Sequence, residues 1–234
     1  MTNYTQWKSL VDLHEYSAIP DSGITRDYET DSLTGFDDGD LVEAIADQQN
    51  NDDLTGSGTY RDGGINNNVS VELNGTDDKF SASATHTTDV YTIGIVFQLS
   101  DLNDRYQIWQ DGEQGSSGHR FEYFDSDNNY RLIHDDDGDL LTAGTGTTDP
   151  VVIVGRYDGD RALYRLNGSV LIDESASYTA PSGSESVLIG ERSDGSLNAP
   201  MDYGRSIHYA NDLSNDDFDN LESTLAEQYD IELS

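Results

Sequence analysis

The run VVIVGRYDGDRALYRLNGSVLID, residues 151–173, decides the fold class. It contains three short segments rich in β-branched and aromatic residues, which is the composition of strands, at 151–157, 161–166 and 169–173. Asn167-Gly168 separates the last two segments, and this dipeptide favours a tight hairpin because both turn residues need positive φ. The sequence 158–160, Asp-Gly-Asp, fits a similar connection between the first two. The run therefore predicts an antiparallel meander.

Similar segments lie on both sides of this meander, at 69–73, 90–99, 105–110, 119–124, 129–134, 186–191 and 203–210. No helical pattern alternates with them, so a parallel sheet built from βαβ units is excluded. About ten short strands of this kind predict an all-β fold, an antiparallel two-sheet jelly-roll sandwich.

A single helix is expected at the end of the chain. Ser214 opens it, with Asp217 three residues later as in a capping box. An apolar stripe at helical spacing follows: Phe218, Leu221, Leu225 and Tyr229. We expect this stripe to pack on the outside of the sandwich.

The charge of the chain points to concentrated salt. The formal net charge is −34, from 46 acids and 12 bases; 34 of the acids are Asp and two of the bases are Lys. At molar salt the Debye length falls to ~3 Å, which screens such self-repulsion. Nucleic acid is excluded as a partner, since phosphate binding needs a basic patch. We expect a haloarchaeal setting and a stability that falls at low salt.

Further classes are excluded by composition. There are no cysteines, so disulfides and thiolate metal sites do not contribute. No apolar run approaches the ~20 residues of a membrane span. The N-terminus lacks the basic start and apolar stretch of a secretory signal. Unless a signal was removed before this numbering begins, we expect the chain to be made and kept on the cytoplasmic side or to leave by a route other than secretion.

Several motifs together resemble one known fold family. Residues 151–173 are similar to strands ending in Tyr-Asp-Gly and carrying Tyr-x-x-Asn-Gly, and residues 186–234 to an Ile-Gly strand, a last strand and a closing helix. The front half adds an Asn-x-x-x-Ser-Val strand and an Asn-Gly-Thr-Asp-Asp turn. In this order they resemble the concanavalin A-like or laminin-G-like lectin jelly roll, over residues 25–234. Two departures are Ile45-Ala46, where relatives have tryptophan, and Pro200–Asp202, where a glycine is usual.

The resemblance implies a binding function. Jelly rolls of this kind occur in structural proteins of tailed viruses, so the expectation is a virion structural or adhesion protein of a haloarchaeal virus, in a capsid decoration, turret or tail fibre. It is made in host cytoplasm, ends on the virion surface and binds host surface glycans. A cell-encoded haloarchaeal glycan-binding surface protein and a glycoside hydrolase of the same fold are the alternatives.

Residues 1–24 form a separate N-terminal arm in this interpretation. Tyr4, Trp7 and Leu10 share one face of a short helix, and Pro20 ends it. The arm either packs on its own domain or contacts other virion proteins and copies of the chain in a homo-oligomer.

Catalysis is not expected from the sequence. Hydrolases of this fold carry alternating acids on one strand, directed into a cleft. The corresponding segment has Glu122, Asp125 and Asp127, whose spacing does not place all three on one face. We therefore expect no enzymatic activity.

A sugar site is expected on the segment RYQIWQ. Alternation places Arg105, Gln107 and Trp109 on one face, with Glu122 and Arg131 on neighbouring strands. An aromatic platform beside polar groups suits a glycan. The alternative is that Trp109 belongs to the core.

One loop resembles a calcium site. Asp125, Asp127 and Asn129 occupy the first, third and fifth places of a calcium loop, and Asp136 the twelfth. Tyr130 stands where such a loop needs glycine, and the alternative is a solvated hairpin loop. No cofactor is required, and Ca²⁺ is the candidate ion.

Overall fold

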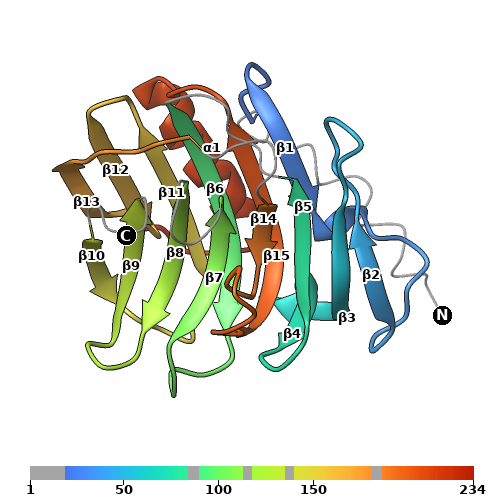
Figure 1. Cartoon of the computed structure of the whole chain (residues 1–234). Helices are drawn as coiled ribbons and strands as arrows, with labels where there is room; N and C mark the ends of the chain where they lie inside the picture. The colour runs from blue at the N-terminus through green and yellow to red at the C-terminus, as the bar shows by residue number, and fades with distance from the viewer. Residues whose placement is uncertain (1–18, 84–89, 113–117, 135–139, 181–185) are drawn as a thin grey trace.

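The computed structural model describes residues 19–83, 90–112, 118–134, 140–180 and 186–234, with only the backbone at 140–143. Fifteen strands in this part of the chain are joined by antiparallel pairing; thirteen form one path that folds into two layers, and the other two pair with strands of that path (Figure 1). The predicted all-β sandwich with a C-terminal helix is confirmed.

The first layer carries the strands of the middle of the chain. Its order is β10 (Leu140–Thr145), β9 (Asn129–His134), β8 (His119–Phe124), β7 (Tyr106–Asp111), β14 (Ser186–Ile189) and β5 (Lys79–Ser83). The strands β7, β8 and β9 follow one another as a meander, and β14 returns from far along the chain to pair with β7.

The second layer contains the run that opened the sequence analysis. Its order is β4 (Asn68–Asn74), β15 (Pro200–Tyr209), β6 (Tyr91–Leu99), β11 (Val151–Tyr157), β12 (Arg161–Leu166) and β13 (Ser169–Ser175). Beyond the end of β4, β1 (Ile24–Glu29) pairs with the second half of β15. Asn167 and Gly168 have φ of 47° and 86°, as the predicted β12–β13 hairpin requires.

One long strand, β3 (Leu54–Ile65), belongs to both layers. Residues 55–57 pair with β5 in the first layer, and residues from Thr59 onward pair with β4 in the second. The short strand β2 (Leu41–Ile45) lies along its other edge, and a 3-10 turn, η2 (Thr30–Ser32), follows β1. Gly56 lies at the junction, where a Cβ atom would meet the Lys79 carbonyl oxygen.

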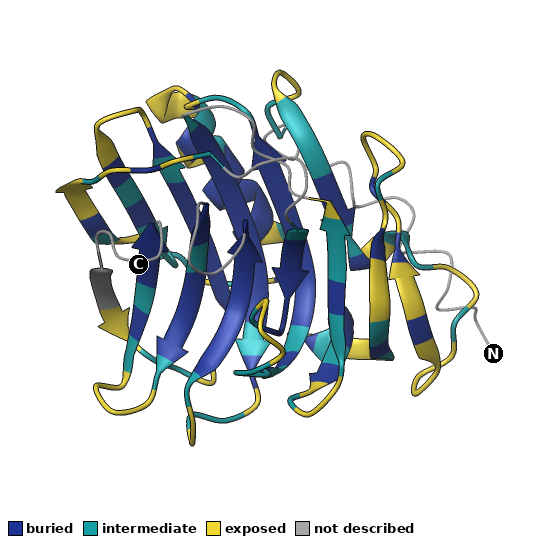
Figure 2. Ribbon diagram, viewed as in Figure 1, coloured by how far each residue is buried: buried dark blue, intermediate teal, exposed yellow. Residues whose placement is uncertain are grey.

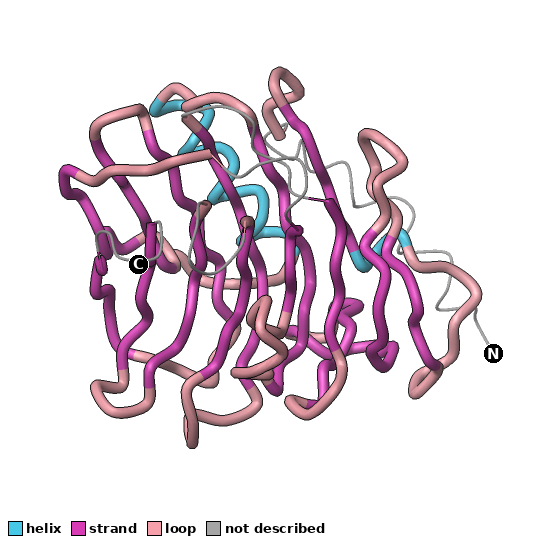
Figure 3. The backbone as a smooth tube through the Cα atoms, in the orientation of Figure 1, coloured by secondary structure: helices cyan, strands magenta, loops and turns pink. Residues whose placement is uncertain are grey.

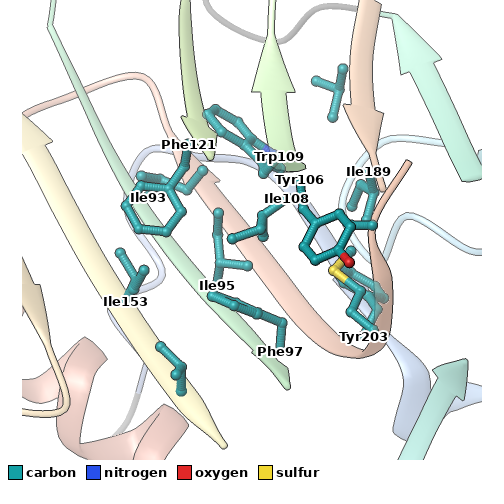
Figure 4. Close-up of a cluster of buried hydrophobic side chains, with 14 of the residues drawn as sticks. Ile93, Ile95, Phe97, Tyr106, Ile108, Trp109, Phe121, Ile153, Ile189 and Tyr203 are labelled. Carbon is teal, nitrogen blue, oxygen red and sulfur yellow. The ribbon is translucent and has the colours of Figure 1, made fainter. Parts of the chain in front are cut away.

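The main core fills the space between the layers. Ile93, Ile95 and Phe97 of β6 face Ile108 of β7 and Phe121 of β8 (Figure 4). The rings of Phe97 and Phe121 have centroids 6.4 Å apart. Burial is therefore concentrated in the central strands, and the edge strands and turns are exposed (Figure 2).

A second apolar cluster lies on the outside of the second layer, under α1 (Asn215–Gln228). The Ser214 hydroxyl accepts a hydrogen bond from the Asp217 amide (3.2 Å) and donates to its carboxylate, as predicted. The predicted stripe is fully buried, against Val96, Val152 and Val154 among others. Among the described residues, no helix has the length and apolar character needed to cross a membrane.

Candidate functional site

Trp109 lies in the core, not on the surface. The register of β7 against β8 shifts between Gln107, opposite Glu122, and Trp109, opposite Phe121. This β-bulge inserts one residue, Ile108, so the alternation of faces is broken and Trp109 turns inward (Figure 4). Its side chain is 1% exposed. The prediction of an exposed tryptophan platform is wrong for this reason, and the core alternative holds.

Gln107 is also withdrawn from solvent. Its side-chain Nε2 donates to the backbone carbonyls of Trp109 (2.7 Å) and Phe121 (2.9 Å). A bulge disrupts the ladder, and this amide satisfies the two carbonyls beside it. Gln107 therefore holds the strand in shape instead of offering a free contact to a ligand.

Three of the predicted residues do come together, on the outer face of the first layer. The Arg105 guanidinium binds both carboxylate oxygens of Glu122, at 2.7 and 2.8 Å from Nη2. Arg131 stacks on the ring of Phe124, with 3.5 Å from its guanidinium carbon to the ring centroid, and pairs with Asp127. Arg105 lies 4.8 Å from the same ring. We call Arg105, Glu122, Phe124 and Arg131 the arginine face.

The arginine face contains an aromatic residue that sequence reasoning missed. Phe124 alternates with Glu122 and Arg120 along β8, opposite the core residues Phe121 and Tyr123. This period-2 pattern in HRFEYF was a signal that could have identified it.

A pocket of about 370 Å³ lies next to this face. We call it the rim pocket, and its lining residues are Asn74, Gly75, Asp101, Asp104, Arg105, Tyr106, Leu197, Asn198 and Pro200. They come from the turn after β4, the loop before β7 and the loop before β15, which lie in the lower half of the molecule in Figure 3. Its volume is in the range of about 300–1,000 Å³ typical of small-ligand clefts.

The loops of the rim pocket are held in place by the sheet. The backbone carbonyl of Leu197 accepts a hydrogen bond from the backbone N–H of Gln107 (2.8 Å). Leu197 itself adopts φ of 58°, in the left-handed region. Gly75 has φ of 70°, and a Cβ atom there would come within 2.9 Å of Pro200. A residue other than glycine, such as Leu197, keeps a left-handed conformation only where its surroundings hold it there. The pocket is therefore preformed.

The polar groups of the pocket are partly paired with each other. The Tyr106 hydroxyl donates to Asp101 Oδ1 (2.5 Å), and this bond is the main cause that lowers the pKa of Asp101. Burial, with the neighbouring Asp101, raises the pKa of Tyr106. Asp104 Oδ1 accepts from the Arg105 amide (2.7 Å). Asn198 Nδ2 donates to the Thr76 carbonyl.

The predicted calcium residues lie at the β8–β9 hairpin. Asp125 and Asp127 are in its turn, Asn129 begins β9, and Asp136 lies outside the described residues. The Asp127 carboxylate is occupied by Arg131 at 2.5 Å. Within the described part of the chain, no group of three or more His, Cys, Asp and Glu side chains is arranged to hold a metal ion. Calcium at this loop stays a prediction.

The assembly residues Tyr4, Trp7 and Leu10 lie outside the described residues. The described chain begins at Ile19, and its first strand, β1, starts at Ile24. The boundary predicted between an arm and a domain near residue 25 therefore remains a prediction.

Comparison with known proteins finds the fold in solved structures. No protein-family model and no curated protein matches the chain. A sialidase of Trypanosoma rangeli in complex with sialic acid is similar, with a TM-score of 0.66 and 13% identity over 90% of this chain and 34% of that one. A mutant of the same sialidase with trans-sialidase activity has a TM-score of 0.64 and 12% identity, over 91% and 34%. The botulinum neurotoxin serotype D binding domain has a TM-score of 0.62 and 11% identity, over 87% and 51%.

These likenesses show a fold shared with a lectin-like β-sandwich, and at 10–13% identity they show the fold alone. The chain spans about a third of the length of the sialidases. They also correct one expectation. From the sequence we expected no enzymatic activity, and that expectation is wrong, because chains that contain this fold include sialidases. The other neighbours include a binding domain.

Proposed function

We propose that the chain is a carbohydrate-binding domain and that the rim pocket is its sugar site. The observation that carries the proposal is the pocket itself, where three loops bring carboxylates, carboxamides, a guanidinium and a phenol together at the edge of a sandwich. Sugar hydroxyls both donate and accept hydrogen bonds, and a preformed set of such groups satisfies them with little ordering cost.

The arginine face supports the same site. Arg105 belongs to both the pocket lining and the arginine face. Its guanidinium lies over the ring of Phe124, so Phe124 contacts a residue that lines the pocket. A sugar longer than one ring would extend from the pocket over this face. The aromatic ring there is already covered by Arg131, so the contact offered is the flat side of a guanidinium.

We also propose the environment of the domain, which is the surface of a virus particle in concentrated salt. The net charge of −34 with 34 Asp residues favours molar salt. A virion adhesion protein of a haloarchaeal virus, assembled through residues 1–24 and binding host surface glycans, fits this charge. Mass spectrometry of purified high-salt virus particles tests it: the chain should be found in the particles. Its presence only in host envelopes would favour a cell-encoded surface protein instead.

Glycan binding is tested with two pocket variants. The parent chain is screened against a glycan array, and the best ligand is then measured by calorimetry in about 1 M KCl, where the Debye length is ~3 Å. Asp104→Ala and Asn198→Ala should each weaken binding about tenfold, since each removes one hydrogen-bonding group, and a tenfold change is about 1.4 kcal/mol.

Matched controls come from the helix. Asp216 and Asn220 lie on α1, which covers the outside of the second layer and contributes no residue to the pocket lining, so Asp216→Ala and Asn220→Ala should leave the affinity unchanged. Equal losses in pocket and helix variants, or no binding of any glycan by the folded parent chain, would refute the site. Reducing ends released from the bound glycan would replace the binding role by hydrolysis.

A further inference from the structure

The rim pocket is rich in groups that accept hydrogen bonds. Asp101 Oδ1 accepts from the Tyr106 hydroxyl and the Asn103 amide, and Asp104 Oδ1 accepts from the Arg105 amide, so each carboxylate keeps capacity to accept from a ligand. The Oδ1 of Asn198 is buried and also lacks a partner in the described part of the chain. A buried acceptor without a donor is costly, so Asn198 Oδ1 favours a ligand that donates, and the more exposed carboxylates of Asp101 and Asp104 can accept from the same ligand.

The cation of the pocket is already neutralised. Among the nine lining residues, Arg105 alone carries a positive charge. Its guanidinium is bound by both oxygens of Glu122, whose side chain is 0% exposed while that of Arg105 is 28% exposed. Because a bidentate pair fixes the guanidinium plane on its own carboxylate, little positive charge is left for a ligand.

Two more carboxylates contact Asn74, a residue of the pocket lining. The Asn74 side chain donates to Asp77 Oδ1 (2.8 Å), and its backbone amide donates to Asp78 Oδ2 (3.3 Å). With Asp101 and Asp104, four carboxylates therefore lie in the pocket lining or in contact with it. The potential inside the pocket is negative, and like charge disfavours an anionic group.

From these contacts we infer that the rim pocket takes a hydroxyl-bearing sugar without negative charge and discriminates against anionic sugars, such as those carrying a sialic or uronic acid. This inference rests on the proposed function and adds the class of ligand to it. Sugar hydroxyls donate to the Asp101 and Asp104 carboxylates and to Asn198 Oδ1, whereas the carboxylate of an acidic sugar would add a further acceptor and a like charge.

The test uses two oligosaccharides that differ only in a terminal sialic acid. By calorimetry in about 1 M KCl, where the Debye length is ~3 Å, the neutral one should bind at least about tenfold tighter. The ratio should increase at the lowest KCl concentration at which the chain stays folded, because screening weakens.

The variant Asp101→Asn with Asp104→Asn removes both charges and keeps similar shapes. It should lower the affinity ratio of neutral to anionic sugar toward one, while Asp216→Asn on α1 leaves the ratio of the parent chain. An anionic sugar that binds as tightly as the neutral one, or a ratio unchanged in the double variant, would overturn the inference while leaving the sugar site in place. Absence of binding by either sugar would instead refute the proposed function.

Discussion

Both layers of the sandwich bury a glutamate beside an arginine, but they use the pair differently. In the second layer Glu222 of α1 pairs with Arg165 (3.2 Å) and accepts from the Gly168 amide (2.8 Å), which fastens the helix to the β12–β13 hairpin. In the first layer Glu122 pairs with Arg105 beside the rim pocket. The Glu222–Arg165 pair helps to hold α1 on the outer face of the second layer. The Glu122–Arg105 pair lies on the outer face of the first layer, which no described helix covers.

This difference follows from what each outer face must do. The strands under α1 present Val96, Val152 and Val154, because a helix is held by apolar contact. The strands of the arginine face present charged side chains that pair with neighbours, Arg105 with Glu122 and Arg131 with Asp127. A face of paired charges needs no covering helix, so we propose that ligand binds beside it, in the rim pocket.

The largest effect is expected where the helix is sealed. Phe218 is fully buried between α1 and the second layer. Phe218→Ala should lower the free energy of unfolding by about 4 kcal/mol, because burial is lost and a cavity remains. Chemical denaturation in constant salt measures this, with Asn220→Ala as the control on the same helix. Any folded Phe218→Ala protein should retain parent affinity at the rim pocket; loss of affinity would show that the two faces are not independent.

A somewhat smaller loss of stability is expected from a substitution in the arginine face. Arg105→Ala leaves the buried Glu122 without its cation and should destabilise the fold by about 3 kcal/mol. The double variant Arg105→Ala, Glu122→Gln should recover part of this loss, since the uncompensated charge is gone. Denaturation curves of the parent, single and double variants form the measurement. A single variant as stable as the parent would mean that Glu122 is not held by Arg105.

The smallest effect is a change of titration within the pocket. Tyr106→Phe removes the hydrogen bond that chiefly lowers the pKa of Asp101, so that pKa should rise toward its ordinary value. A lowered pKa gives stability that is present above the unfolded-state value of about 3.9 and is lost as pH falls through the folded-state value. The variant should therefore lose less stability on acidification. Carboxyl titration by NMR checks it; an unchanged pKa of Asp101 would contradict the contact.

Local signals made much of the fold predictable from sequence. Asn167-Gly168 predicts a hairpin because both residues readily adopt the positive φ that its turn requires. Ser214 and the apolar stripe after it predict the helix from the spacing of residues within one segment. The bulge in β7 could not be read in this way, because register depends on pairing with β8. Trp109 was misplaced for that reason alone.

The site was predictable only in part for a related reason. Arg105, Glu122 and Arg131 come from consecutive strands of a meander, so their meeting follows from alternation. The rim pocket joins loops near residues 74, 101 and 198, whose neighbourhood is set by the return of β14 and β15. No pattern within one segment encodes that meeting.

The position of β15 has a consequence for how the chain reaches this structure. It lies inside the second layer, between β6 on one side and β1 and β4 on the other, although it is synthesised after all of them. Until it arrives, the pairing edges of those strands have no partner, and β1 must wait for residues about 180 positions later, as in the Asp27 pairing with Ile207. Such non-local pairing makes folding slow and leaves open edges on the growing chain. Closure of the sandwich is therefore a late event, which waits for β15 to leave the ribosome.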